Sequence, residues 1–224
     1  DNYIFEGTFG RPLFISLTLA PDLVSTLLFP WQWAFLVIKW ACNKNIMANI
    51  LVTGGAGFIA SHLVDALIAQ GNEVTVIDDL SSGLREYVNP QAAFVQASIG
   101  DPAIADLFFQ NSFDLVYHLA AQTDVRKSVA DPMADNDINV RGAYNILENC
   151  RKHKVRKLVF ASTGGAIYGE ADIVPTPEHY PASPLSPYGI HKFTFEKYLN
   201  YCHHVFGQDY TVLRFANVYG PRQY

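Results

Sequence analysis

The sequence predicts an α/β fold, a doubly wound parallel sheet of the Rossmann type. Two observations carry this prediction. Residues 49–79 form one complete strand, helix and strand unit, with a glycine-rich turn after its first strand. Short apolar runs then alternate with amphipathic helical stretches along the rest of the chain, a pattern typical of parallel strands joined by crossover helices.

The first unit can be followed along the chain. Residues 50–52 are a short apolar run of the kind that buried parallel strands show, and the run stops at Gly54. From Phe58 the apolar residues fall on one helical face, and Gly71 supplies a helix end. A second apolar run then ends at Asp78, which closes the unit.

The turn after the first strand has the form of a phosphate-binding site. Gly54 permits a tight turn, Gly57 lets the backbone approach a pyrophosphate, and Ala60 allows close packing of helix on strand. The unpaired N–H groups of the first helical turn, at Phe58 and Ile59, favour an anion. An ordinary strand-to-helix turn is the alternative, but the complete unit around the glycines favours nucleotide binding.

Asp78 indicates which dinucleotide binds. It lies 21 residues after Gly57, at the end of the second strand, where its carboxylate can accept both ribose hydroxyls of an adenosine. The same charge would repel a 2′-phosphate, so NAD is preferred over NADP. Arg85 in the following loop is the feature that could favour NADP.

The composition indicates a globular protein of a reducing compartment, and we expect the cytoplasm. The chain has 224 residues, 50% of them hydrophobic and 17% charged, which is enough for one large domain with a core. Its net charge of −5 argues against a nucleic-acid partner. Cys42, Cys150 and Cys202 lie far apart without CxxC or metal-ligand spacing, which indicates buried thiols and no metal site.

Residues 1–46 do not share the pattern of the rest of the chain. The stretch 13–42 is strongly apolar and aromatic, with interrupting prolines and charges. As a membrane span, residues 23–40 are barely long enough, and a secretory signal would need a basic segment first. Because Met47 directly precedes the first strand, we interpret 1–46 as an apolar leader outside the domain. A membrane-associated helix is the alternative.

The chain after residue 79 continues the alternation of strands and helices. A loop with five prolines interrupts it at 175–187, because proline extends neither kind of hydrogen-bond ladder. Ser186 with Pro187 is a typical helix start, and Gly207 a typical helix end. We expect strands at 93–96, 113–121, 155–162 and 210–215, and helices at 103–109, 135–154 and 186–207.

A tyrosine and a lysine on the last of these helices are candidates for acid/base chemistry. Tyr188 and Lys192 are four residues apart, so they lie on one helix face, and the ammonium is expected to lower the pKa of the phenol. Thr163, just past the fifth strand, supplies a hydroxyl for the same substrate oxygen. Such a pair alone is common on helix surfaces, but its place downstream of a nucleotide-binding unit favours catalysis.

Seven motifs in residues 47–224 agree in order and spacing with one known family. They are TGGAGFIASH, VIDDLSSG, HLAAQ, NVRGAYNILE, STGGAIYGE, PYGIHK and LRFANVYGPRQ. In these motifs the chain resembles the extended short-chain dehydrogenase/reductase family. Within that family it is most similar to the NAD-dependent nucleotide-sugar epimerases and dehydratases of the UDP-glucose 4-epimerase type. Residues 1–46 have no counterpart.

The resemblance implies an NAD-dependent isomerase that inverts C4 of a nucleotide sugar through a 4-keto intermediate. The implied catalytic residues are Thr163, Tyr188 as the base, and Lys192. Asn139 matches a structural asparagine. The residues implied in NAD binding are Gly54, Gly57, Phe58, Ile59, Asp78, Ser98, Ile99, Ala120, Ala121, Tyr188 and Lys192, and those implied in substrate binding are Thr163, Tyr188 and Asn217.

The chain departs from the family pattern at several positions. Ala60 replaces the third glycine, and Ser98 replaces an acidic residue near the adenine, which weakens that contact. Thr163 rather than Ser162 is assigned by counting from the fifth strand, because one extra residue precedes Tyr168. Family members continue beyond the GPRQ motif into a smaller substrate domain, so we expect this chain to be cut short.

The residues after Thr163 separate the possible reactions. A 4,6-dehydratase needs an acid and a base there and a decarboxylase needs a glutamate, whereas this chain has Gly164, Gly165 and Ala166. Epimerisation is therefore favoured over both. The alternative from another class is a non-catalytic NAD-binding regulator or an inert fragment, and the intact catalytic residues argue against it.

Several histidine and aromatic side chains have simpler interpretations. His118 is expected to be a packed, hydrogen-bonded histidine, and His191 a surface residue of its helix. Tyr168 is either a core residue or faces the substrate. Apolar stripes on the helices that carry Tyr144 and Tyr198 exceed what one sheet face needs. Such helices pair in the family, so a homodimer is expected, with packing inside a monomer as the alternative.

Overall fold

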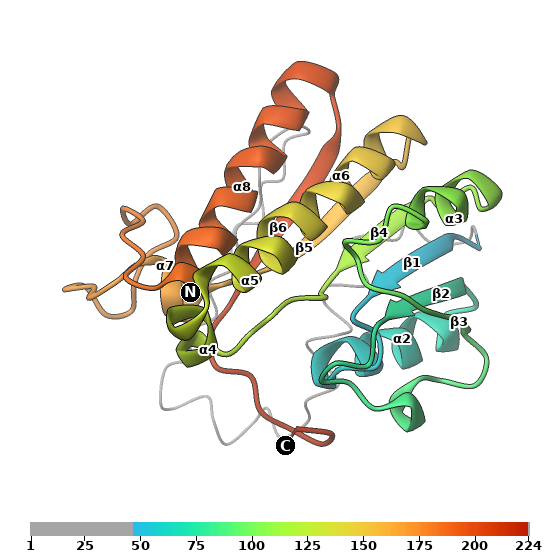
Figure 1. Cartoon of the computed structure of the whole chain (residues 1–224), viewed down its shortest axis with the longest axis horizontal. Coiled ribbons are helices and arrows are strands. Elements are labelled where there is room, and N and C mark those ends of the chain that lie inside the picture. Colours follow the sequence, from blue (N-terminus) through green and yellow to red (C-terminus); the bar gives the residue numbers. More distant parts are fainter. Residues whose placement is uncertain (1–46, 224) are drawn as a thin grey trace, which may run out of the picture.

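The computed structural model describes residues 47–223 as a parallel sheet with helices on both faces (Figure 1). The interpretation of residues 1–46 as a leader concerns a segment outside these described residues. Within 47–223, no helix is both long and apolar enough to cross a membrane.

Six strands form the sheet in the order β3-β2-β1-β4-β5-β6, and every neighbouring pair is parallel. The chain starts in the middle at β1, moves outward to β3 and returns to β4 on the other side of β1, which confirms the predicted doubly wound sheet. The strands are β1 Asn49–Thr53, β2 Glu73–Asp78, β3 Ala93–Gln96, β4 Leu115–His118, β5 Lys157–Thr163 and β6 Asp209–Phe215.

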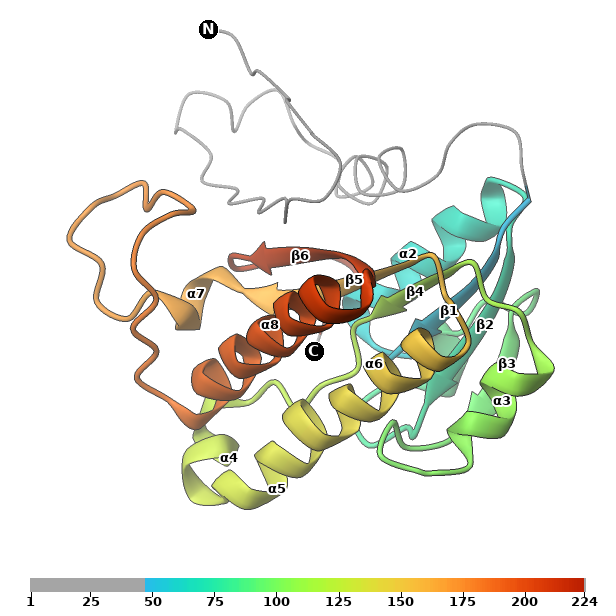
Figure 2. The ribbon, with the colours of Figure 1, turned by 90° about the horizontal axis from the view of Figure 1, so that it is seen from above.

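Helices cover both faces of the sheet, with α2 on one face and α3, α6 and α8 on the other (Figure 2). The α-helices are α2 Phe58–Ala69, α3 Ile104–Gln110, α4 Val125–Ala130, α5 Pro132–Asn136, α6 Ala143–Lys152, α7 Gly164–Ile167 and α8 Pro187–Phe206, with a π-helical segment at Asp137–Gly142 and a 3₁₀ turn at Arg85–Tyr87.

The central strands bury side chains on both faces because helices cover both. On β1, Leu51 packs into the layer of α3, α6 and α8, whereas Ile50 and Val52 pack under α2. All three side chains are fully buried. Burial on both faces explains why this strand is an unbroken apolar run rather than an alternating one.

The winding direction of the sheet changes between β1 and β4. Thr53, the last residue of β1, pairs with Ile77 of β2 on one side and with His118 of β4 on the other. The carboxyl ends of these strands therefore lie level, and the chain leaves them toward opposite faces of the sheet. Ligands of open α/β sheets bind in the crevice at such a point.

The structure differs from the predicted elements in a few places. β4 ends at His118 rather than at 121. The Leu119 N–H still donates to the Thr53 carbonyl, but the Ala120 N–H donates to the Thr53 side chain instead of the backbone. The long helical stretch begins at Pro132 rather than at 135, and its N-cap Asp131 accepts a hydrogen bond from the Ala134 N–H. The short helices α4 and α7 are not expected from the sequence, since neither is long enough to show a helical period.

Candidate active site

Two glycines shape the turn between β1 and α2. Gly54 has a φ of +75°, which L side chains rarely adopt, and a Cβ there would lie 2.7 Å from the Ala120 nitrogen. This geometry confirms the predicted tight turn. The sequence pattern does not single out Gly55, yet a Cβ on it would lie 2.5 Å from Cγ1 of Val76. Gly55 is therefore the residue that lets the turn lie against β2.

The N-terminus of α2 has the form of an anion site. Gly57 is its N-cap and has no side chain to occupy the first-turn amides, among them those of Phe58 and Ile59. A Cβ on Gly57 would lie 3.1 Å from the Gly54 carbonyl oxygen. Ala60 is buried against the sheet. Free amides at a helix start with little side-chain bulk fit a pyrophosphate.

Asp78 ends β2 beside this turn and is buried. Its Oδ2 accepts a hydrogen bond from the Ala56 N–H at 2.9 Å, and its Oδ1 accepts one from the Leu80 N–H at 2.8 Å. Burial raises the pKa of Asp78, while these two N–H groups oppose the rise. A carboxylate at this place fits an adenosine ribose. The Arg85 guanidinium, which could favour NADP, lies 4.3 Å from the centre of the Phe94 ring.

The segment after β4 passes over the glycine turn. The Ala120 N–H donates to Thr53 Oγ1 at 3.2 Å, and Ala120 and Ala121 are half-buried. Asn139, buried in the π-helical segment, accepts from the Gln122 N–H at 3.1 Å and donates to the Gln122 carbonyl at 2.9 Å. Two bonds to one backbone unit hold this segment in place, which suits the structural role expected for Asn139.

Ser98 and Ile99, which the family resemblance places near the adenine, follow β3. Ser98 is exposed, and its Oγ accepts a hydrogen bond from the Gly100 N–H at 3.3 Å. Ile99 is buried in the core under α6, where a Cβ on Gly142 would lie 2.9 Å from its Cγ1. Of the two residues, only Ser98 presents an exposed polar side chain.

Thr163, Tyr188 and Lys192 come together at the carboxyl end of β5. Thr163 is the last residue of β5, and its side chain hydrogen-bonds the Tyr188 phenol in the first turn of α8. Lys192 is buried, its Nζ donates to the Ala161 carbonyl at 2.9 Å, and this Nζ lies 5.9 Å from the centre of the Tyr188 ring. The fold thus gathers the three residues that the sequence indicates.

Ser162, the other candidate hydroxyl, belongs to a buried network behind the site. Its Oγ donates to Glu196 Oε1 at 2.6 Å, and Arg214 binds both oxygens of Glu196 at 3.0 and 2.6 Å. Arg214 Nη1 also donates to the Tyr168 hydroxyl at 2.7 Å. Tyr168 is therefore a core residue, and the geometry favours Thr163 over Ser162 as the hydroxyl of the site.

The expectation that Lys192 lowers the pKa of Tyr188 is wrong. Burial and the charge of Asp135 raise the pKa of Tyr188 to about 12, although the bond from Thr163 opposes the rise. Lys192 does not oppose this rise, and its ammonium donates to the Ala161 carbonyl rather than to the phenol. Burial in turn lowers the pKa of Lys192 to about 8, against nearby carboxylates that favour its charged form.

One of the two histidine predictions is confirmed and the other is wrong. His118 is buried, its Nδ1 lies 2.7 Å from Thr53 Oγ1, and its ring stacks on Phe160. Burial lowers the pKa of His118 to about 3, so it is the neutral, packed histidine expected. His191 is not a surface residue, because its Nδ1 lies 2.5 Å from Oδ2 of Asp135, whose side chain is 1% exposed.

Asn217 is exposed on the segment that follows β6. This segment runs to α2, where Arg222 Nη2 lies 2.8 Å from Asp65 Oδ2 and His62 Nε2 lies 3.0 Å from the Pro221 carbonyl oxygen. Asn217 thus lies on the segment that runs from the end of β6 to α2, the helix whose N-terminus forms the anion site, which suits a contact with a bound molecule.

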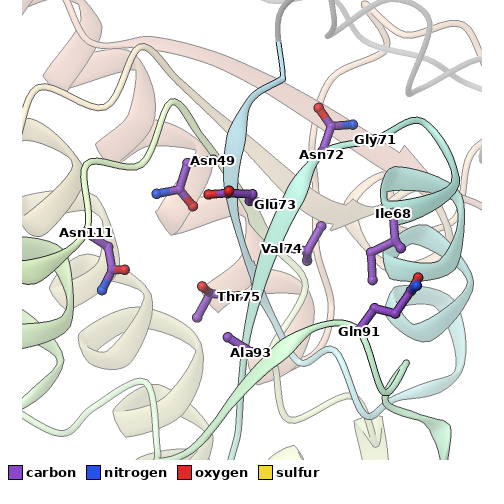
Figure 3. A pocket seen from close by; sticks show the side chains of 10 residues that line it. All are labelled: Asn49, Ile68, Gly71, Asn72, Glu73, Val74, Thr75, Gln91, Ala93 and Asn111. Atoms are coloured by element: carbon purple, nitrogen blue, oxygen red, sulfur yellow. The ribbon is translucent and has the colours of Figure 1, made fainter.

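A separate pocket of about 520 Å³ lies at the opposite edge of the sheet (Figure 3). Its lining includes Asn49, Glu73 and Ala93, which are the first residues of β1, β2 and β3. Ligands of open α/β sheets bind outside the carboxyl ends of the strands. This pocket at the amino ends is therefore not the nucleotide site.

Residues 50–224 match the NAD dependent epimerase/dehydratase family. The chain belongs to this family. The family depends on NAD, which agrees with the glycine turn and with the carboxylate of Asp78.

Relatives with solved structures share the fold. The UDP-glucose 4-epimerase of Thermotoga maritima, solved with UDP-glucose, is 50% identical with a TM-score of 0.77, over 78% of this chain and 57% of its own. The UDP-glucose 4-epimerase of Thermus thermophilus, solved with NAD, is 46% identical with a TM-score of 0.76 and the same coverage, 78% and 57%. The curated UDP-glucose 4-epimerase of Mycolicibacterium smegmatis is 43% identical over 77% of this chain and 57% of its own length. This chain therefore spans a little over half the length of these relatives.

Sequence reasoning missed Asp135 and Gln122 as parts of the site. Gln122 Nε2 donates to Asp135 Oδ1 at 2.7 Å, and Asp135 contacts His191 on α8, the helix of Tyr188 and Lys192. A signal for Asp135 does exist, because it precedes Asn139 by one helical turn and so shares its face. Gln122 directly follows the two alanines expected to contact NAD, but nothing in the local pattern assigns its side chain a role.

Proposed function

We propose that this protein interconverts the C4 epimers of a nucleotide sugar with bound NAD, as UDP-glucose 4-epimerases do. The observation that carries the proposal is the convergence of Thr163, Tyr188 and Lys192 at the carboxyl end of β5, on the edge of the sheet that also carries the glycine turn. The high identity to UDP-glucose 4-epimerases supports UDP-glucose and UDP-galactose, or their N-acetyl forms, as the substrates.

The residues proposed to hold NAD lie along one edge of the sheet, at the carboxyl ends of its strands. The amides at the start of α2 bind the pyrophosphate, and the segment after β4 passes beside the cofactor. The proposed NAD contacts are Gly54, Gly57, Phe58, Ile59, Asp78, Ser98, Ile99, Ala120, Ala121, Tyr188 and Lys192, and the proposed substrate contacts are Thr163, Tyr188 and Asn217.

Tyr188 moves the proton in the proposed reaction. It takes the proton of the sugar 4-hydroxyl as C4 gives up its hydride, so that a 4-keto sugar forms. Thr163 donates a hydrogen bond to the same sugar oxygen and holds it. NAD, when bound, accepts this hydride and later returns it. Once the sugar has presented its other face, Tyr188 gives the proton back as the hydride returns, and the configuration at C4 is inverted.

The raised pKa of Tyr188 sets a condition for this chemistry. With a pKa of about 12 the phenol is protonated at neutral pH, so its base form needs positive charge close to the oxygen. Lys192, with a pKa of about 8, is mostly charged at pH 7, but its ammonium donates to the Ala161 carbonyl and must turn toward the phenol to supply this charge. The positive nicotinamide ring of a bound cofactor adds to this field.

The residues after Thr163 favour epimerisation over the related reactions. Gly164, Gly165 and Ala166 form the start of α7, and none carries a side chain that can move a proton. A 4,6-dehydratase or a decarboxylase would need such a group here. A regulator that only bound NAD would have no use for the buried Lys192 ammonium, which costs stability.

We also propose a homodimer and a cytoplasmic location. Tyr144 of α6 and Tyr198 of α8 are partly exposed, with ring centres 5.2 Å apart, and Tyr201 extends this apolar surface. The free thiols of Cys150 and Cys202 are buried, as is usual for a protein of a reducing compartment. Light scattering tests the dimer, and a monomer at micromolar concentration would contradict it.

Product analysis by NMR tests the proposed reaction. Because the chain spans 57% of the Thermotoga relative, the assay uses the chain alone and the chain continued past Tyr224 with the matching part of that relative, hereafter the extended enzyme. We expect UDP-glucose to give UDP-galactose without net consumption of NAD. A 4-keto-6-deoxy product would instead establish a dehydratase.

A further inference from the structure

Asp135 and His191 form a buried pair beside the catalytic residues. His191 lies on α8 between Tyr188 and Lys192, and its Nδ1 is 2.5 Å from Asp135 Oδ2. The side chain of Asp135 is 1% exposed and that of His191 15% exposed. Burying a carboxylate is costly even when it is paired. A pair that costs stability at this place points to a role in the site.

The other oxygen of Asp135 connects to the segment after β4. Gln122 Nε2 donates to Asp135 Oδ1 at 2.7 Å, while the backbone of Gln122 is held from both sides by Asn139. Gln122 directly follows Ala121, one of the proposed NAD contacts. Through these bonds Asp135 joins the catalytic helix to the segment that lies beside the cofactor.

A second contact holds the same end of α8. The Tyr188 N–H donates to Ser128 Oγ at 3.1 Å, and the Ser128 hydroxyl donates to the Val125 carbonyl at 2.7 Å. Ser128 belongs to α4 and is fully buried. The short helices α4 and α5 lie against the N-terminal end of α8 (Figure 1). They contact the turn that carries Tyr188 at two points, Ser128 and Asp135.

Two carboxylates near Lys192, those of Asp135 and Glu196, favour its charged form. Glu196 is the other carboxylate that favours the Lys192 ammonium, but Arg214 binds both of its oxygens. Asp135 has an amide and an imidazole as partners rather than a permanent cation. The neighbouring His118 is neutral and the phenol on α8 is protonated at pH 7. Of these two carboxylates, Asp135 is therefore the one that no arginine of residues 47–223 binds.

We propose that Asp135 and His191 are positioning residues of this active site, which hold the turn of Tyr188 and Lys192 in place and keep the Lys192 ammonium charged. The inference rests on the proposed roles of Tyr188 and Lys192. The contact of His191 with one oxygen of Asp135 and that of Gln122 with the other fix the direction of this carboxylate. The direction of one pKa effect agrees with this proposal, because the charge of Asp135 raises the pKa of Lys192 and so favours its ammonium form.

The first test measures the charge of Lys192 in the full chain, with neither NAD nor sugar added. Asp135→Asn keeps the size of the side chain and removes its charge, so the pKa of Lys192 should fall by about one pH unit in an NMR titration of the lysine Cε signals. The control is Asp137→Asn, which removes an exposed carboxylate paired with Arg141 and should leave Lys192 unchanged. An unchanged Lys192 in folded Asp135→Asn would overturn the proposal.

The second test measures the position of the turn by amide hydrogen exchange at Tyr188. His191→Leu removes the bond to Asp135 and should speed this exchange about tenfold or more, whereas His191→Asn retains a donor and should stay near the wild-type rate. His204→Leu, an exposed position of the same helix, is the control. Equal exchange in His191→Leu and wild type would overturn the positioning role. Neither measurement depends on turnover, so a failed epimerase assay would leave both results interpretable.

Discussion

The Ser162 hydroxyl donates a 2.6 Å hydrogen bond to Glu196, which directs it into the buried network of Arg214. Neighbouring residues of a strand point to opposite faces of the sheet, so the next side chain, Thr163, points the other way and meets Tyr188. Of the two adjacent hydroxyls, only that of Thr163 is therefore placed for the proposed reaction.

This relationship predicts opposite effects for two conservative substitutions. In the extended enzyme, Thr163→Val should lower kcat by roughly ten- to a hundredfold, the loss expected for one hydrogen bond to the reacting oxygen. Ser162→Ala should keep kcat near that of the wild type and lower the free energy of unfolding by about 1–2 kcal/mol, because Glu196 loses a buried partner. Steady-state kinetics measure kcat, and urea unfolding measures stability. A larger loss of kcat in Ser162→Ala than in Thr163→Val would show that Ser162 supplies the hydroxyl that binds the reacting oxygen.

The close approach at Gly55 predicts a packing defect that weakens cofactor binding. In Gly55→Ala the new methyl would lie 2.5 Å from the Val76 side chain, so the turn must move away from β2. We expect a loss of roughly 1–3 kcal/mol in stability, together with weaker NAD binding. Thermal unfolding and NAD titration measure both quantities. The matched control is Gly100→Ala, whose nearest neighbour, Ser98 Oγ, lies at an ordinary 3.8 Å. Equal behaviour of the two variants would show that the turn tolerates a side chain.

The carboxylate of Asp78 predicts the choice of dinucleotide. Calorimetric titration of the chain should give tighter binding of NAD than of NADP, since a 2′-phosphate would meet this negative charge. Asp78→Ser should narrow the difference in affinity between the two dinucleotides, because NAD would bind more weakly and NADP would no longer be repelled. Tighter binding of NADP to the wild-type chain would remove the role given to Asp78.

The lowered pKa of Lys192 predicts how stability depends on pH. Its pKa is about 8 in the folded protein and close to 10.5 when unfolded, so between these values only the unfolded state holds the proton. Stability from this group therefore rises with pH across that window, by roughly 3 kcal/mol. Comparing wild type with Lys192→Met isolates the contribution. Urea unfolding at several pH values should show that the free energy of unfolding of the wild type rises relative to that of the variant from pH 8 to 10. A difference that stays constant over this range would mean that Lys192 keeps its ordinary pKa.

The sheet and the convergence of Thr163, Tyr188 and Lys192 could be predicted because their signals are local. Apolar runs bounded by glycine set the strands, and a single helical turn relates Tyr188 to Lys192 whatever the surroundings. Thr163 follows from its place at the end of a strand. The parallel sheet then follows from the alternation of strands and helices.

The polar network around the site could not be predicted because it depends on contacts between distant segments. His191 has the sequence environment of a surface helix residue, and only the packing of α5 on α8 brings Asp135 to it. The prediction that the pKa of Tyr188 is lowered is wrong for the same reason. Helical spacing places an ammonium near the phenol, but burial and the acceptor of that ammonium, the Ala161 carbonyl, depend on the tertiary fold.

Tyr188→Phe in the extended enzyme tests the central claim most directly. The substitution removes the phenol oxygen and hardly any volume, so NAD binding measured by titration should stay within a few-fold of the wild type. Turnover of UDP-glucose should fall by about two to four orders of magnitude, as expected when a positioned acid/base is lost. A variant that binds NAD but no longer epimerises is the predicted result. A Tyr188→Phe variant that keeps most of its turnover would show that another residue moves the proton.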